Sequence, residues 1–392
     1  MKTLKRTWAD ISLDNLEYNY RSIRAHLPQG TKFLGVMKAD AYGHGAVPVS
    51  RALADLGAEY LAVSNLEEAV QIRRGEVRLP ILILGYTPAE YAANMIFLDI
   101  TQEVHSLEYA RELNEALAGT NYILNVHLKL DTGMTRIGFF AYDNERTLDE
   151  LRQVAQLPHL HIEGVFMHFC VADSRAEADV SFTKLQYKRF MDMLSAMAGV
   201  GIRPEIRHCC NSGATILYPE FALDMVRPGI ITYGNAPSDE LEGALSLRPM
   251  MSLHSMIAQV RTVPAGTDIS YGRLYRTKAE TRVAVLPIGY ADGLSRLLTG
   301  KASFYLQGHQ VPVIGRICMD MCMIDVSNVP EAKPGDVVTI FGYDDDGTLL
   351  PCERLARAQG TINYELLCQI SKRIPRICHR GAETSQILQY IV

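Results

Sequence analysis

The sequence predicts an α/β protein in which an N-terminal (β/α)8 barrel is followed by a mainly antiparallel β-domain. Short apolar runs alternate with segments of helical periodicity through about Gly234, and eight such repeats favour a closed parallel barrel. From about residue 240 the pattern changes to β-rich runs separated by Pro, Gly and Asp turns. We therefore expect a barrel domain over residues 1–240 and a β-domain over residues 241–392.

The expected barrel strands are short apolar runs bounded by turn residues or helical segments. In chain order they are KFLGVMK, EYLAVS, PILILGY, FLDIT, YILNVHLKL, HIEGVFMHF, PEIRHC and a last run around ALDMVRPGIITYG. Among the helices between them, one places Phe182, Leu185 and Met193 on a single face. Another begins with Ser64 three residues before Glu67, which is the spacing of a capping box.

The second half of the chain reads mainly as strands. The runs RVAVLPIG, VPVIGRICM, CMIDV and DVVTIFG are separated by turn residues, and one clear helix is expected near INYELLCQISKRI. No low-complexity linker separates the two halves, so we expect two packed domains.

The composition excludes several classes of function. Of 392 residues, 48% are hydrophobic and 21% are charged, with a net charge of -5, so neither nucleic acid nor an anionic membrane is an expected partner. The N-terminal stretch has no signal-peptide core, and no apolar run reaches transmembrane length. The 8 cysteines are scattered without a C-x-x-C pair, so we expect reduced thiols, no metal site and a cytoplasmic location.

Residues that could carry chemistry fall at the expected strand ends. In a (β/α)8 barrel the reactive side chains lie at the C-terminal ends of the strands, where the sequence places Lys38 and His168. Phosphate sites in such barrels form from the loops after the last two strands, which here read NSG (211–213) and RPGI (227–230). A lysine facing a phosphate cradle is the layout for pyridoxal 5′-phosphate, which forms a Schiff base with the amine.

The segment VMKADAYGHG resembles the cofactor-lysine motif of the alanine racemases, and the likeness continues along nearly the whole chain. The blocks HLKLDTGMTRIGF, MHFCVAD, NSGAT, MVRPGIITYG, ISYGRLY, LPIGYADG, GRICMDM and TINYELLCQISKRIPR follow in the order of that family. The resemblance implies a pyridoxal phosphate-dependent amino-acid racemase. It also implies a homodimer with shared active sites, in which the β-domain of one chain contributes the second catalytic base to the other.

The resemblance also assigns roles residue by residue. Lys38 matches the lysine that forms the aldimine and acts as one base, and Tyr271 matches the other base. Arg136 and Met319 match the contacts to the substrate carboxylate, the latter through its backbone N–H. The residues that match the cofactor site are Lys38, Tyr42, His168, Asn211, Ser212, Arg227, Gly229, Ile230 and Tyr364.

The chemistry explains why these residue types are needed. Racemisation removes a proton from one face of a carbon and returns one to the other face, so two bases fit the task better than one. A phenol has a pKa of about 10, so a tyrosine that acts as a base needs positive charge nearby, and His168 and Arg227 are the candidates. Arg227 only donates hydrogen bonds, so a pyridine nitrogen that faces it is expected to stay unprotonated.

Alternatives to an alanine racemase that supplies D-alanine for peptidoglycan remain open. A serine or broader-specificity racemase of the same fold would use the same residues, although Tyr364 beside the substrate side chain favours alanine. A decarboxylase of the same fold is disfavoured because such enzymes place an acid where this chain has Arg227. A cofactor-carrying regulator would be expected to lack one of the bases. Some members of the family carry a carbamylated lysine at the position of Lys129.

Overall fold

Parallel strands form a nearly closed barrel in the unit made of residues 16–41 and 46–248. The computed structural model describes residues 6–142 and 144–391. Within that part of the chain the strands are hydrogen-bonded in the order β10-β2-β3-β4-β5-β6-β8-β9, and neighbouring strands in this order are parallel. They are β2 (Lys32–Val36), β3 (Tyr60–Val63), β4 (Ile81–Ile83), β5 (Ile100–Val104), β6 (Leu124–Asp131), β8 (Leu160–Phe166), β9 (Ile206–His208) and β10 (Met225–Val226).

Backbone hydrogen bonds bring the two ends of this sheet together. The N–H of Asp224 donates to the carbonyl of Arg207 at 3.1 Å, and the N–H of Arg227 donates to the carbonyl of Cys210 at 2.9 Å. A short strand, β7 (Phe139–Phe140), pairs with β6 beside the barrel path. The predicted barrel is therefore confirmed, with each expected run supplying one strand.

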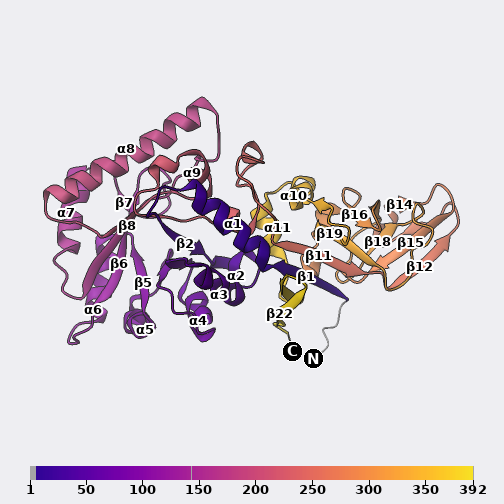
Figure 1. Ribbon diagram of the computed structural model, residues 1–392, viewed down its shortest axis with the longest axis horizontal. Helices are drawn as coiled ribbons and strands as arrows, with labels where there is room; N and C mark the ends of the chain where they lie inside the picture. The colour runs from indigo at the N-terminus through magenta and orange to yellow at the C-terminus, as the bar shows by residue number, and fades with distance from the viewer. Residues whose placement is uncertain (1–5, 143, 392) are drawn as a thin grey trace. The chain divides into compact units, whose positions relative to one another are not determined.

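Helices lie around the outside of the barrel strands (Figure 1). Two local predictions on these helices are wrong. The helix after β3 is capped by Asn65, whose side chain accepts from the N–H of Glu68, rather than by Ser64. On α8, Met193 is buried but Leu185 is exposed, and Gln186 takes the buried place beside it. The helices of this unit are α1 (Leu13–His26), α3 (Ala46–Leu56), α4 (Leu66–Arg74), α5 (Ala92–Phe97), α6 (Leu107–Ala116), α7 (Asn144–Val154), α8 (Glu177–Gly199) and α9 (Ser212–Leu217).

The second unit is a mainly antiparallel sheet built from residues 249–392, together with residues up to Asn15 and residues 42–45. Its main strand order is β12-β15-β18-β17-β16-β19-β11-β1-β21-β22, which bears out the predicted β-domain. Its strands are β1 (Thr7–Ser12), β11 (Met251–Met256), β12 (Gln259–Val263), β13 (Asp268–Ile269), β14 (Tyr275–Arg276), β15 (Thr281–Leu286), β16 (Ser303–Leu306), β17 (His309–Ile314), β18 (Cys322–Asp325), β19 (Val337–Tyr343), β20 (Leu349–Leu350), β21 (Arg376–Arg380) and β22 (Glu383–Leu388). Its helices are α10 (Cys352–Gln359) and α11 (Asn363–Gln369).

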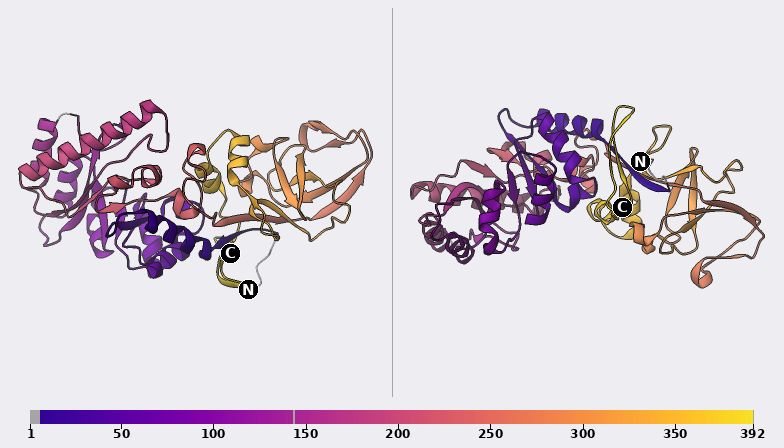
Figure 2. Two further views of the ribbon diagram at one scale, coloured as in Figure 1. Left: turned by 45° about the horizontal axis from the view of Figure 1, so that its top comes forward. Right: turned by 90° about the horizontal axis from the view of Figure 1, so that it is seen from below.

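The N-terminal strand belongs to this second unit, although the sequence placed residues 1–240 together. Figure 2 shows β1, in indigo, running among the orange and yellow strands. It pairs antiparallel with β11 and parallel with β21, so its backbone is hydrogen-bonded on both sides. Trp8 and Ile11 are buried there, and a strand that precedes the first helix has no local signal for which sheet it joins. No helix within residues 6–142 or 144–391 is both long and apolar enough to cross a membrane.

Candidate functional site

Lys38 lies two residues after the end of β2 and begins a strained turn, α2 (Lys38–Tyr42). Ala39, Asp40, Ala41 and Tyr42 all have positive φ, between 51° and 55°, so this single turn is left-handed. Each residue with a Cβ in that conformation is disfavoured by about 1–2 kcal/mol. Runs of such residues persist only where the surrounding structure determines them, and they concentrate at functional sites. Lys38 itself is exposed at the end of its strand.

Carboxylates from the barrel unit hold this turn. Glu68, in the first turn of α4, accepts the N–H of Ala39 at 2.6 Å with one oxygen and the N–H of Ser64 at 2.8 Å with the other. Asp40 accepts the N–H of Ala46 at 2.7 Å, which ties the turn to the start of α3. Hydrogen bonds to a charged acceptor are stronger than neutral ones, so these contacts offset part of the strain beside Lys38.

Arg227, at the end of β10, is the centre of a buried hydrogen-bond cluster. Only 3% of its surface is exposed. Its guanidinium donates to the carbonyls of Met167 at 2.8 Å and Cys209 at 3.1 Å, and it lies 2.9 Å from Nδ1 of His208 and 3.2 Å from Nδ1 of His168. Burial lowers the pKa of Arg227 to about 10, so the group is charged at neutral pH.

The fixed donors of Arg227 determine the tautomers of the histidines that follow it. Because a guanidinium only donates, Nδ1 of His208 accepts and its proton lies on Nε2. That Nε2 is 2.9 Å from Nδ1 of His127, so His127 must carry its own proton on Nε2, where it donates to Glu163 at 3.0 Å. Burial, reinforced by the charge of Arg227, lowers the pKa of both His208 and His127, so both rings are neutral at neutral pH. The donated hydrogen bonds thus run in one direction through the barrel, from Arg227 through the two histidines to Glu163.

His168 is also held in the neutral form. Burial, with the charge of Arg227, lowers the pKa of His168 well below its usual value. Its Nδ1 accepts from Arg227, which leaves the proton on Nε2. The sequence suggested both residues as sources of positive charge for a tyrosine base. The structure confirms that they are hydrogen-bonded, but of the two only Arg227 carries the charge.

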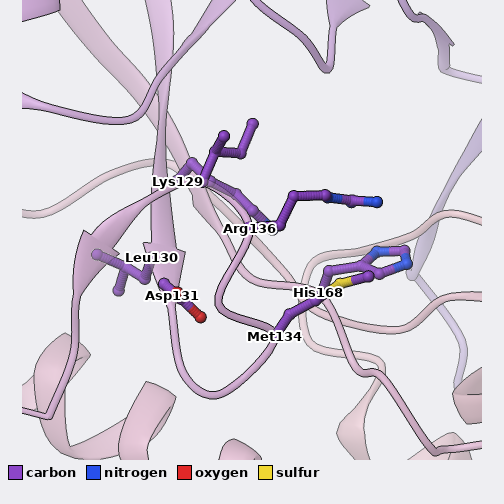
Figure 3. Close-up of a pocket in the computed structure, with 7 residues that line it drawn as sticks. Lys129, Leu130, Asp131, Met134, Arg136 and His168 are labelled. Atoms are coloured by element: carbon purple, nitrogen blue, oxygen red, sulfur yellow. The ribbon is translucent and has the colours of Figure 1, made fainter.

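Lys129, Arg136 and His168 line one pocket at this end of the barrel (Figure 3). The loop that carries Arg136 follows β6, and Asp131 shapes it by accepting two of its amides at 3.0 Å each. Arg136 is exposed, and Figure 3 shows its side chain extending to the same side as the ring of His168. Lys129 is buried over the ring of Phe166, 4.6 Å from the ring centre. Burial and the charges of Arg227 and Arg136 lower the pKa of Lys129 well below its usual value.

The two loops named by the sequence meet at the ends of β9 and β10. The N–H of Gly229 donates to Oγ of Ser212 at 2.9 Å, so the hydroxyl of Ser212 keeps its own proton to donate elsewhere. Ile230 begins the next short helix, Ile230–Tyr233. A Cβ at Gly213 would lie 2.9 Å from the backbone of Ala172, so only glycine fits there. These residues form a small cradle of backbone N–H groups and one hydroxyl.

Asn211 joins this cradle to the strand end that carries His168. Its Oδ1 accepts the N–H of Ala214 and so caps α9, while its Nδ2 donates to the carbonyl of Phe169 at 3.1 Å. Asn211 therefore fixes the spacing between the cradle and the residue after His168. The ordering role that the sequence resemblance implies for Asn211 stays a prediction.

The remaining predicted residues lie in the second unit. The rings of Tyr42 and Tyr364 are 6.0 Å apart. The backbone next to Tyr42 packs closely against α11, the helix that contains Tyr364. A Cβ at Gly43 would lie 2.5 Å from the carbonyl of Leu367 in α11. Arg376 reinforces this packing by donating to the carbonyl of Gly43 at 2.9 Å. Tyr42 is buried, and that burial raises the pKa of its phenol, so the hydroxyl is a donor at neutral pH.

Tyr271 and Met319 are both strongly exposed, at 71% and 53% of their surface. The segment before Met319 packs on a glycine, because a Cβ at Gly289 would lie 2.3 Å from the carbonyl of Cys318. Two large apolar side chains presented outward by tight turns are typical of an interaction or binding surface.

Several residues that support the site were not predicted from the sequence, namely Glu68, His127, Glu163, Gln186 and His208. His127 could have been predicted from the sequence, because it lies two residues before Lys129 in one strand and therefore shares its face. Gln186 could not be found from the sequence, because it is one polar residue within a long helix. In the structure its side-chain amide donates to the carbonyl of His168 at 3.2 Å. Residues of this kind are identified by the contacts that they make.

Comparison with known proteins covers almost the entire chain. The family described as "Alanine racemase, N-terminal domain" matches residues 11–237, and "Alanine racemase, C-terminal domain" matches residues 250–378. An alanine racemase of Desulfovibrio desulfuricans is 46% identical over 94% of this chain and 97% of its own length. One of Clostridium tetani is 42% identical over 100% of both chains. A solved alanine racemase of Clostridium difficile 630 superposes with a TM-score of 0.93 at 39% identity over 100% of both chains. The predicted resemblance is confirmed.

Proposed function

This chain belongs to the alanine racemase family, and from that premise we propose that it interconverts L-alanine and D-alanine with Lys38 and Tyr271 as its two bases. The observation that carries the proposal is the arrangement at the barrel strand ends. An exposed lysine on a braced, strained turn shares its end of the barrel with a glycine cradle and a buried arginine. This is the donor set that a phosphorylated pyridine aldehyde requires.

The residues present fit pyridoxal phosphate, on which the family depends. The cradle supplies N–H and hydroxyl donors of the kind that bind phosphate, and glycine keeps the backbone open there. We propose that Ser212, Gly229 and Ile230 hold the phosphate together with Tyr42 and Tyr364. When bound, the cofactor supplies the electron sink that makes the α-proton of an amino acid removable.

Arg227, His168 and Asn211 would order the ring of the cofactor. The guanidinium of Arg227 is locked by the carbonyls of Met167 and Cys209, so it cannot turn away from its place. Because a guanidinium only donates hydrogen bonds, a pyridine nitrogen that faces it would stay unprotonated. An unprotonated ring is a weaker electron sink, which limits side reactions.

The proton steps fall to two side chains. Lys38 would hold or release a proton at Nζ on one face of the α-carbon, and Tyr271 would do the same at its phenol oxygen on the other. The positive charge that a tyrosine base requires would come from Arg227, because His168 is neutral.

We assign the substrate carboxylate to Arg136 and to the backbone N–H of Met319. A guanidinium binds a carboxylate through two parallel hydrogen bonds. Arg136 has a lysine beside it whose pKa is lowered, and an uncharged amine can attack carbon dioxide, forming an N–C bond and releasing a proton. The carbamate of Lys129 would place a negative charge next to Arg136 and steady it.

Alanine is the favoured substrate because of Tyr364. Its ring lies beside that of Tyr42, which leaves an aromatic wall where a longer side chain would have to fit. Serine adds one hydroxyl, and an apolar wall discriminates against it only modestly. A serine or broader racemase therefore remains the second candidate.

We propose that the active form is a homodimer with shared sites. Residues 1–240 would bind the cofactor, and residues 241–392 would offer Tyr271 to the partner subunit. The strong exposure of Tyr271 and Met319 supports this, since residues that must meet substrate would otherwise face solvent. The 8 cysteines of the chain are free thiols, which supports a cytoplasmic enzyme that makes D-alanine for peptidoglycan.

A chiral assay with purified protein tests the activity. We expect rapid D-alanine formation from L-alanine and weaker turnover of L-serine, whereas equal or preferred serine turnover would establish the second candidate. Borohydride reduction followed by peptide mass spectrometry tests the site. It is expected to add the cofactor mass to the peptide with Lys38, and cofactor on another lysine would refute the assignment.

A further inference from the structure

The turn that carries Tyr271 is strained on both sides of it. Ser270 has φ 66° and ψ −175°, a region that is almost exclusive to glycine. Gly272 and Arg273 follow with φ of 72° and 52°. A turn that only had to connect β13 with β14 would place glycine at position 270, where it carries no penalty. The serine therefore has a role that offsets the strain.

The side chain of Ser270 is tied to one particular segment. Its Oγ donates to the carbonyl of Arg316 at 2.7 Å and lies 3.5 Å from Sγ of Cys318. The backbone fits closely as well, since a Cβ at Gly315 would lie 2.9 Å from the Cβ of Ser270. The Tyr271 turn and the segment from Gly315 to Cys318 are thus packed as one piece.

The far side of the turn is held by charge. Asp268 accepts from the guanidiniums of Arg273 and Arg276, the latter at 2.8 Å. Hydrogen bonds from Arg276 and Arg273 lower the pKa of Asp268 to about 2, so it stays ionised at any pH at which the enzyme would work. Both arginines are exposed and Asp268 is half-buried, so salt screens these ion pairs.

The segment that is hydrogen-bonded to Ser270 leads directly to a proposed substrate contact. Cys318 precedes Met319, and their carbonyls accept the N–H groups of Tyr290 and Ala291 at 3.0 Å each. The hydroxyl of Ser270 therefore links the residue before one proposed base to the segment that presents the backbone N–H of Met319.

We propose that Ser270 is a positioning residue for racemisation. Its strained backbone and its hydrogen bond to Arg316 fix the phenol of Tyr271 relative to the substrate-carboxylate contact at Met319. The inference rests on the proposed function and deepens it, because it makes the geometry of one proton transfer depend on a residue that touches neither substrate nor cofactor.

Two substitutions at Ser270 separate positioning from folding. Ser270→Ala removes the hydroxyl and keeps the strain, whereas Ser270→Gly removes both. We expect both variants to lower kcat about tenfold or more, with KM changed less, because small misplacements of a reacting group have large effects. We expect Ser270→Gly to resist denaturant better than Ser270→Ala, since glycine accepts the backbone conformation. Gln307→Gly, at a residue of φ 50° between β16 and β17, is the matched control for strain release and is expected to keep kcat.

Exchange of the α-proton in deuterated water gives a readout that a purely structural role would not move. With Tyr271 misplaced, the enantiomer that Lys38 deprotonates is expected to keep exchanging without inversion, and the other enantiomer is expected to exchange slowly. Wild-type kcat in both variants, or exchange lost equally for both enantiomers, would overturn the inference. An inactive wild-type enzyme would instead overturn the proposed function.

Discussion

The two turns that carry the proposed bases are both strained, but they are braced in different ways. The Lys38 turn has four successive residues of positive φ, and it is tied to two helices by the half-buried carboxylates of Glu68 and Asp40. The Tyr271 turn is held on one side by the hydroxyl of Ser270 and on the other by the ion pair between Arg276 and Asp268.

The difference shows that each of the two units positions its proposed base in its own way. The barrel turn places its amine with contacts that lie within its own unit, as expected of a group that also has to anchor a cofactor. The second turn presents a tyrosine that is 71% exposed. A base on such a turn is suited to a site that is completed by another surface, which is the reason for proposing a shared active site.

Replacing Tyr271 is expected to give the largest loss. Tyr271→Phe removes the phenol oxygen and keeps the ring, so racemisation is expected to fall by about 10²- to 10⁴-fold while cofactor binding is kept. Tyr275→Phe, four residues along the same segment, is the matched control and is expected to stay near wild type. The chiral assay measures both. A Tyr271→Phe enzyme with full activity would remove Tyr271 from the mechanism.

Loosening the Lys38 turn is expected to give a smaller loss. Glu68→Gln replaces one acceptor oxygen with a donor that faces a backbone N–H, which leaves that N–H unsatisfied. We expect kcat to fall about fivefold to tenfold, from the loss of about one hydrogen bond. Glu67→Gln, exposed in the same helical turn, is the control. If both variants behaved alike, the brace assigned to Glu68 would be wrong.

The pH dependence of stability sharpens the comparison further. The folded-state pKa values of His127 and His208 are lowered, so below about pH 6.5 the unfolded chain binds more protons than the folded one. The free energy of unfolding is therefore expected to fall as the pH drops, by about 1.4 kcal/mol per pH unit for each such histidine. The contribution of Asp268, whose folded-state pKa is lowered to about 2, is instead kept down to about pH 4 and is lost as the pH falls from there toward 2.

Denaturant unfolding between pH 5 and 7 measures this effect. His208→Gln is expected to flatten the profile, because glutamine has no proton to gain, whereas His309→Gln, at an exposed residue, is expected to leave it unchanged. A profile for His208→Gln as steep as that of wild type would show that the buried histidine chain does not titrate on unfolding.

The sequence predicted the framework because its signals are local. Apolar runs and glycine turns place Lys38, Ser212 and Gly229 at strand ends without any knowledge of tertiary contacts. The capping box predicted at Ser64 was wrong by one residue, because Asn65 is an equally good cap. The side chain of Glu68 accepts the N–H groups of Ser64 and Ala39 instead.

The supporting contacts could not be predicted, because they join residues that are far apart in the chain. His127 and His208 are 81 residues apart and are neighbours only once the barrel closes. The backbone of Ser270 gave no signal either, since serine is usual in turns and nothing local requires its unusual φ. The neutral state of His168 likewise depends on its burial and on the charge of Arg227, which lies 59 residues away in the chain.

The most direct test of the shared-site account is a hybrid dimer made from two inactive chains. Lys38→Ala and Tyr271→Phe chains carrying different tags are co-expressed, and dimers that contain both are purified. If each site takes Lys38 from one chain and Tyr271 from the other, one of the two sites in the hybrid is complete, and its activity is expected to be about half that of wild type. A hybrid as inactive as its two parents would show that both bases come from one chain, and would contradict the account.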